Sequence, residues 1–207
     1  MWPCVWNVSC LRLVLALLLM VLPALGGCSN MRHVEWTEDV KLSDGRMIVV
    51  QRSEDYRRVV DPGAGFRKGW LFQKSIITAE LPAPVQRKVS WEGSLKPLVL
   101  DIEEDNTIYL VGVVATGAGR HEWDVPRNEL YVVFRLTQGG WEHIPLAELP
   151  LSVKPNLLGG TYILFVDREA RSGIHVDLEL KKELNSLGSP PKRYESIIRL
   201  PAPDSKE

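Results

Sequence analysis

The chain has 207 residues, in which 25 lysines and arginines face 26 aspartates and glutamates, so that the formal net charge is −1. This near-neutral balance, with no basic stripe along the sequence, gives no general attraction for nucleic acid or an anionic lipid surface. We therefore expect no nucleic-acid partner.

The first predicted element is an uncharged apolar run, LVLALLLMVLPAL, over residues 13–25. It is shorter than the about 20 residues that cross a bilayer core, and its length is typical of a secretory signal. Pro23 would also disturb a continuous spanning helix. We predict that residues 1–27 are a removable signal peptide.

Leu25, Gly26, Gly27 and Cys28 follow and resemble the lipobox of bacterial lipoproteins, in which a branched apolar residue and two small residues precede the cysteine. The resemblance implies recognition by a signal peptidase, cleavage before Cys28, a thioether-linked diacylglycerol, and acylation of the new amino terminus by fatty acids such as palmitate. Two or three acyl chains hold a protein on a membrane durably, because each buried CH₂ contributes about 0.8 kcal/mol. Ser29 lacks the aspartate linked to inner-membrane retention, which favours the outer membrane, facing the periplasm. The alternative is an uncleaved helix or an ordinary signal peptide with an incidental thiol.

Cysteine use fits such processing. Cys4 and Cys10 lie in the leader, so Cys28 is the only cysteine of the mature chain. Disulfides, cysteine-based zinc sites and thiol nucleophiles are thereby excluded. A hydrophobic core must stabilise the domain, which is feasible for the remaining 180 residues.

The mature chain consists of short apolar runs separated by turn residues. In residues 34–42, Trp36 and Val40 share one face of a predicted strand, while Glu35, Thr37, Asp39 and Lys41 lie on the other. Ser43-Asp44-Gly45 predicts a tight hairpin into residues 46–52. A charged stretch from Glu54 then leads into the glycine-rich loop DPGAG, and residues 69–81 predict another strand or hairpin.

The second half continues this pattern. Leu98, Leu100 and Ile102 alternate with Asp101 and Glu103, an alternation typical of a half-buried strand. Further strands are expected over residues 107–115, 129–136, from Trp141 onward, 161–167, 174–180 and 194–200. Leu180, Leu184 and Leu187 have helical spacing, which predicts a short helix at 181–187 with Gly188 as its cap.

These elements predict an all-β fold, an antiparallel sandwich or barrel of about nine or ten strands with at most one or two short helices, and a sandwich is favoured. We expect one domain over residues 34–200, a lipidated tether at 28–33 and a disordered tail at 201–207. The five tether residues after Cys28 reach less than about 20 Å. The domain should therefore lie almost against the membrane.

His121, Glu122 and Asp124 form the densest set of polar ligands, beside Gly117-Ala118-Gly119. The set lacks the second histidine of a zinc-hydrolase helix, and no helix is predicted there. We therefore favour an exposed loop over a metal or acid–base site. No catalytic residue, metal ligand or cofactor is assigned.

Tryptophans are spread over separate strands or strand ends. Most should belong to the core, but Trp70 or Trp123 is a candidate for a binding face. The five in the mature chain are Trp36, Trp70, Trp91, Trp123 and Trp141.

Residues 35–46, EWTEDVKLSDGR, resemble the opening of small uncharacterised lipoproteins of proteobacteria, which often also carry a strand of the type WEHIPL, here residues 141–146. The resemblance covers a minority of the chain. It supports a place in the bacterial envelope and implies no catalytic residues.

Three functional hypotheses remain open. The first is a non-catalytic binding or structural module, anchored to the membrane through Cys28. The second is a periplasmic hydrolase or metal-dependent enzyme that uses His121, Glu122 and Asp124. The third is an inhibitor or immunity-type lipoprotein that caps an envelope protein, which requires an exposed apolar patch around a tryptophan.

Overall fold

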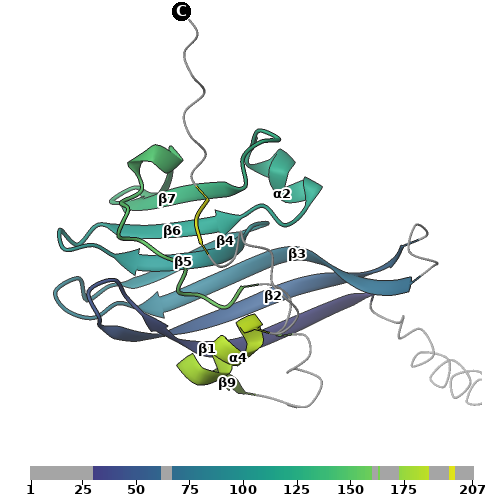
Figure 1. Cartoon of the computed structure of the whole chain (residues 1–207), viewed down its shortest axis with the longest axis horizontal. Helices are drawn as coiled ribbons and strands as arrows, with labels where there is room; N and C mark the ends of the chain where they lie inside the picture. The colour runs from purple at the N-terminus through teal and green to yellow at the C-terminus, as the bar shows by residue number, and fades with distance from the viewer. Residues whose placement is uncertain (1–29, 62–66, 160–162, 164–172, 187–195, 199–207) are drawn as a thin grey trace, which may run out of the picture. The chain divides into compact units, whose positions relative to one another are not determined.

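Nine strands dominate the regular structure of the residues that are described (Figure 1). The computed structural model describes residues 30–61, 67–159, 163, 173–186 and 196–198. The predicted signal peptide, Leu25 to Cys28 and the predicted tail at 201–207 lie outside these ranges. In chain order the elements are β1 (Met31–Lys41), β2 (Met47–Asp61), β3 (Arg67–Glu80), β4 (Lys88–Gly93), β5 (Lys96–Ile102), β6 (Ile108–Val113), α2 (Gly117–Glu122), β7 (Tyr131–Thr137), β8 (Gly140–Ile144), the 3-10 helix η2 (Leu146–Glu148), β9 (Ile174–Val176) and α4 (Leu178–Ser186).

The strands form two sheets, with the orders β4-β3-β2-β1-β9 and β5-β6-β7-β8. All neighbours are antiparallel except β1 and β9, which pair in parallel over three residues of each strand. The arrangement confirms the predicted all-β sandwich of about nine strands.

A hydrophobic core fills the space between the sheets. Inward residues alternate along β1 and β2 in the pattern expected for strands with one buried face. The main cluster takes side chains from both sheets, among them Val40, Val50, Ile77, Trp91, Leu100, Leu110, Val132 and Phe134.

The four-stranded sheet is covered on its other face as well. Tyr109, Val111 and Val133 on that face pack with Leu149 and Val153 from the segment after β8. Every residue of β5 and β6 is therefore buried. The half-buried alternation predicted for Asp101 is wrong, because its side chain is 1% exposed and its carboxylate accepts hydrogen bonds from the backbone N–H groups of Ser43 and Ile102. Burial raises the pKa of Asp101, and these hydrogen bonds oppose the shift.

The predicted hairpin at Ser43-Asp44-Gly45 is confirmed between β1 and β2. Gly45 has a φ of +88°, which glycine adopts without steric cost. The N–H of Arg46 donates to the Asp44 carboxylate at 2.8 Å. Local turn chemistry therefore contributes to the register of the first strand pair.

Some element boundaries differ from the prediction. β1 begins at Met31, three residues before the strand start predicted at Val34. β2 continues through the charged residues after Glu54 up to Asp61, since these residues stay paired with β3. The helix predicted at 181–187 is confirmed as α4, which starts earlier, at Leu178.

Two predicted strands lie largely outside the described residues. Of residues 161–167 only Ile163 is described, and it is buried and helical. Of residues 194–200, those described, 196–198, are not in a strand.

A network of buried charges connects the sheets. Arg52 of β2 pairs with Glu38 of β1 at 3.4 Å and with Glu54 at 3.1 Å. Lys96, which belongs to the four-stranded sheet, reaches Glu54 at 2.7 Å, and Tyr56 donates a hydrogen bond to the same carboxylate. All four charged side chains are at most 4% exposed.

Aromatic rings and backbone groups complete this buried charge network. The Arg52 guanidinium lies 4.8 Å from the centroid of the Trp36 ring, and its Nη1 donates to the Leu158 carbonyl at 2.9 Å. Glu38 accepts hydrogen bonds from Trp36 and from the N–H of Leu158. Burial lowers the pKa of Lys96, and the facing Glu54 opposes that shift.

We predict that Glu54→Gln lowers the free energy of unfolding by about 3 to 5 kcal/mol, because it leaves Lys96 and Arg52 enclosed without their shared counter-charge. Urea unfolding of the mature chain measures this loss. The control is Glu92→Gln, which breaks the solvent-exposed Lys74–Glu92 pair and should change stability little. Equal effects of the two substitutions would contradict a structural role for the network.

Candidate functional site

The outer face of the five-stranded sheet is the candidate site, because polar side chains reach solvent over its middle part. On β1, for example, Glu35 is exposed and Thr37 is half-buried, whereas their neighbours Trp36 and Glu38 point into the core. The four-stranded sheet offers no comparable face, since every described position of β5 and β6 is buried.

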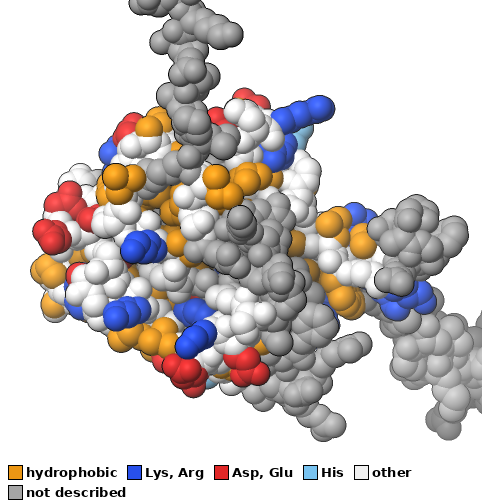
Figure 2. All heavy atoms as spheres, in the orientation of Figure 1, with side chains coloured by type: hydrophobic (Ala, Val, Ile, Leu, Met, Phe, Trp, Pro, Cys, Tyr) orange, Lys and Arg blue, Asp and Glu red, His pale blue; other side chains and the backbone are white. Residues whose placement is uncertain are grey.

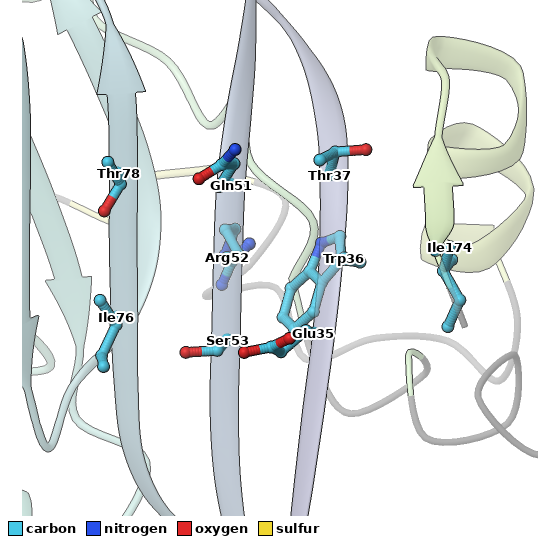
Figure 3. A pocket seen from close by; sticks show the side chains of 10 residues that line it. Glu35, Trp36, Thr37, Gln51, Arg52, Ser53, Ile76, Thr78 and Ile174 are labelled. Carbon is cyan, nitrogen blue, oxygen red and sulfur yellow. The ribbon is translucent and has the colours of Figure 1, made fainter. Parts of the chain in front are cut away.

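Strand register aligns hydrogen-bonding side chains across the whole sheet. Thr37 is opposite His175 on one side and Gln51 on the other, and Gln51 is opposite Thr78. Thr78 in turn pairs with Ser90 of β4. We call these five residues, one from each strand, the central row. Figure 3 shows Thr78, Gln51 and Thr37 side by side, with Ile76, Ser53 and Glu35 in the next row.

A hollow of about 540 Å³ lies over this face. We call it the groove, and it is lined by Glu35, Trp36, Thr37, Gln51, Arg52, Ser53, Ile76, Thr78, Gly173 and Ile174. A second hollow of about 380 Å³ shares Gln51 and Thr78 with it and continues to Val49 and Lys88. Together the two hollows are lined by residues from all five strands of the sheet.

His33 lies between two carboxylates on this face. Its Nδ1 is 2.6 Å from Asp55, and its Nε2 is 2.9 Å from Glu35. Hydrogen bonds to Glu35 and Asp55 raise the pKa of His33 above its usual 6.5, against a smaller desolvation effect. This side chain therefore carries positive charge to a higher pH than a free histidine.

His175 forms a second polar cluster, on β9. Its Nδ1 is 2.9 Å from the Thr37 hydroxyl, and its Nε2 is 3.4 Å from Asp39. The side chain is exposed on the outer face of the sheet.

Chemically, the groove is suited to hydrogen bonding. Hydroxyl groups, one amide and one carboxylate alternate across strands spaced about 4.8 Å apart. Ile76 and Ile174 add apolar contacts at its sides. Among the described residues, no three histidine, cysteine, aspartate or glutamate side chains meet in a way that would hold a metal ion.

The backbone at His121 and Glu122, which precede Asp124, is helical and not the loop that was predicted. Residues Gly117–Glu122 form the helix α2, contrary to the loop prediction, because Thr116 caps it through a hydrogen bond from the N–H of Gly119. The three side chains are exposed, and none of them lines the groove. The structure gives the hydrolase hypothesis no supporting geometry.

The two candidate tryptophans have different surroundings. Trp123 is half-buried against the core, stacked on Trp91 at 6.4 Å and edge-on to Phe134 at 4.9 Å. Trp70, the fourth residue of β3, is 37% exposed. Only Trp70 is thus presented to a partner.

The residues of the predicted lipobox, Leu25, Gly26, Gly27 and Cys28, lie outside the described residues. Within the described part of the chain, no helix has the length and apolarity needed to cross a bilayer.

Sequence reasoning missed the groove itself. The alternation in residues 34–42 did indicate a polar face that contains Glu35 and Thr37. The partner strands contribute Gln51, Ser53 and Thr78, whose alignment depends on a register that the sequence does not reveal.

Comparisons with protein-family models, with curated proteins and with solved structures gave no match.

We predict that the pKa of His33, measured by a pH titration followed by NMR, exceeds 6.5. Asp55→Asn should shift it down, because the substitution removes an acceptor that stabilises the imidazolium. The resulting stabilisation is complete below pH 6.5 and is lost as the pH rises through the folded-state pKa. Ser53→Ala is the control and should leave the titration unchanged; a wild-type pKa at or below 6.5 would refute the predicted interaction.

Proposed function

We propose that this chain is a bacterial lipoprotein, held at the periplasmic face of the outer membrane by lipid on Cys28, and that it acts there as a non-catalytic binding module. The anchor rests on the apolar leader and on the Leu25-Gly26-Gly27-Cys28 box. The binding role rests on one observation, the long polar groove on the open face of the five-stranded sheet.

The shape and chemistry of the groove favour an extended ligand. Hydrogen-bonding side chains recur on three adjacent strands, so a chain laid across the sheet would meet one at each step. The volume of about 540 Å³ is within the usual range for ligand sites. A polymer of the envelope with closely spaced hydroxyl or amide groups fits these features.

The residues beneath the groove are fixed by buried interactions. Trp36 and Arg52, which lie beneath it, belong to the buried charge network and hold β1 and β2 in one register. A ligand would therefore meet a preorganised surface, which reduces the entropy lost on binding.

We predict that replacing Cys28 with alanine prevents maturation. In a Gram-negative host the wild-type chain should incorporate a fatty-acid probe and fractionate with the outer membrane, whereas Cys28→Ala stays unprocessed and unlabelled. Cys10→Ala is the matched control, since that residue is removed with the leader, and it should be labelled as the wild type is. Equal labelling of Cys28→Ala and the wild type would rule out the anchor.

A photo-crosslinking amino acid at position 51 should capture the envelope ligand in intact cells. The same group at Glu104, which is exposed in the turn between β5 and β6, serves as the control. We expect an adduct at position 51 that Ser53→Trp suppresses, because the indole ring would fill the groove. Adducts of equal yield at both positions, insensitive to that substitution, would refute the groove as the binding site.

A further inference from the structure

At one end of the five-stranded sheet, β1, β2 and β3 extend beyond the edge strand β4. β4 pairs with β3 only from Ser75 to Glu80, while the pairing of β2 with β3 continues to Asp61 and Arg67. We define the distal arm as residues 31–32 of β1, 57–60 of β2 and 68–71 of β3. Figure 1 shows β2 and β3 continuing to the right, past the second sheet.

The distal arm is basic throughout. Between these bounds it contains Arg32, Arg57, Arg58 and Lys68 and no acidic residue, and the strand pair ends just beyond it at Asp61 and Arg67, which add one charge of each sign. The whole chain has a net charge of −1. Arg57, Arg58 and Lys68 are exposed. The sequence shows no basic stripe, because these four residues come from three separate segments that only the strand register brings together.

Apolar side chains accompany these charges. Met31 is 47%, Val60 51%, Trp70 37% and Leu71 36% exposed. Figure 2 shows orange and blue side chains next to one another on this part of the molecule. An exposed group of large apolar side chains on a folded domain indicates a surface that contacts a partner.

Register interleaves the two kinds of side chain. Arg57 is opposite both Met31 and Leu71, and Arg58 is opposite Trp70. The Arg32 guanidinium lies 5.7 Å from the centroid of the Trp70 ring. Because successive residues of a strand point to opposite faces, both faces of the distal arm carry cations beside apolar groups.

Covalent connectivity restricts where this surface can be. Met31, the first residue of β1, follows Cys28 by three residues, which span at most about 11 Å. If Cys28 carries the lipid of the proposed function, on which this inference rests, the distal arm begins within that distance of the membrane surface.

We propose that the distal arm is a membrane-contact surface that binds anionic phospholipid. Tryptophan prefers the interface between headgroups and acyl chains. If the end of the arm enters that interface, Trp70 contacts it from one face of the sheet and Leu71 from the other. Arginine and lysine near an anionic surface each contribute attraction to the headgroup phosphates. The contact orients the anchored domain, since one lipid-bearing residue alone leaves it free to rotate about its tether.

The same patch around Trp70 is what the capping hypothesis requires of a protein interface. Two features favour lipid. The arm carries four cations, and the Asp61–Arg67 pair that ends its strands adds no net charge, so the arm complements phosphate; it also starts three residues from the predicted anchor. A protein occupant is therefore an outcome of the test.

The test uses a single fluorescent label on the mature, lipidated chain. Cys4 and Cys10 are removed with the leader and Cys28 is blocked by its thioether, so Leu71→Cys introduces one reactive thiol. Glu80→Cys, at the other end of the described part of β3, is the matched control. At about 3.3 Å per residue, the two labels lie about 30 Å apart.

Each labelled protein is reconstituted in phosphatidylcholine vesicles with or without phosphatidylglycerol, and a lipid-borne nitroxide serves as the quencher. We expect strong quenching at position 71 and weak quenching at position 80 in the anionic vesicles. Arg57→Gln with Arg58→Gln, or omission of phosphatidylglycerol, should reduce quenching at position 71. Each lost charge should weaken the arm–membrane equilibrium about fivefold.

Mass spectrometry of the same samples separates the two proposals. Lipid present on Cys28 with equal quenching at positions 71 and 80 would overturn the membrane-contact surface and leave the anchor intact. Lipid absent from Cys28 would overturn both. If the label at position 71 is shielded from solvent in native envelope membranes but not in vesicles, the arm binds a protein, and the lipid proposal is overturned.

Discussion

Two carboxylates and their cationic partners, enclosed between the sheets, are the constraint on which the rest of the structure depends. Glu38 and Glu54 are each shared between partners, and Lys96 carries the connection from one sheet to the other. Removing one charge from such a network lowers the free energy of unfolding considerably, because the remaining charged partners stay buried and cannot be solvated by water. Adjacent residues of a strand point to opposite faces, so a fixed inner register also fixes the outer one. The alignment of Thr37 with Gln51 in the groove is thus a consequence of the pairing behind it.

The same three strands carry two different surfaces. Over the middle of β1, β2 and β3 the outer face is polar and hollowed, and in the distal arm both faces of the sheet carry basic and apolar side chains. A lipid on Cys28 would bring the distal arm to the bilayer, and the groove lies farther along the same strands. Binding to the membrane and binding of a ligand are in this way assigned to separate parts of one sheet. The arm would set the orientation in which the groove is presented to the periplasm.

Local signals in the sequence predicted the fold well. The Asp44-Gly45 turn, the alternating strands and the leucine spacing of α4 each arise from interactions between near neighbours. The buried charges were not predicted, because a charged residue such as Arg52 is solvent-exposed by default and its partners come from distant segments. The groove and the distal arm could not be predicted from the sequence either, because both depend on the register between strands. The helix α2 was missed because its six residues include two glycines, and a single cap at Thr116 starts it.

Intact-mass analysis of the protein purified from the outer membrane tests the central claim, a lipid-anchored binding module, most directly. The account predicts a chain that begins at Cys28 and carries the mass of residues 28–207 plus a diacylglyceryl group and an amide-linked fatty acid. Its amino terminus should resist sequential degradation, because acylation blocks it. A chain that still begins at Met1, or that begins elsewhere without lipid, would contradict the anchor and remove the basis for placing the distal arm at a membrane.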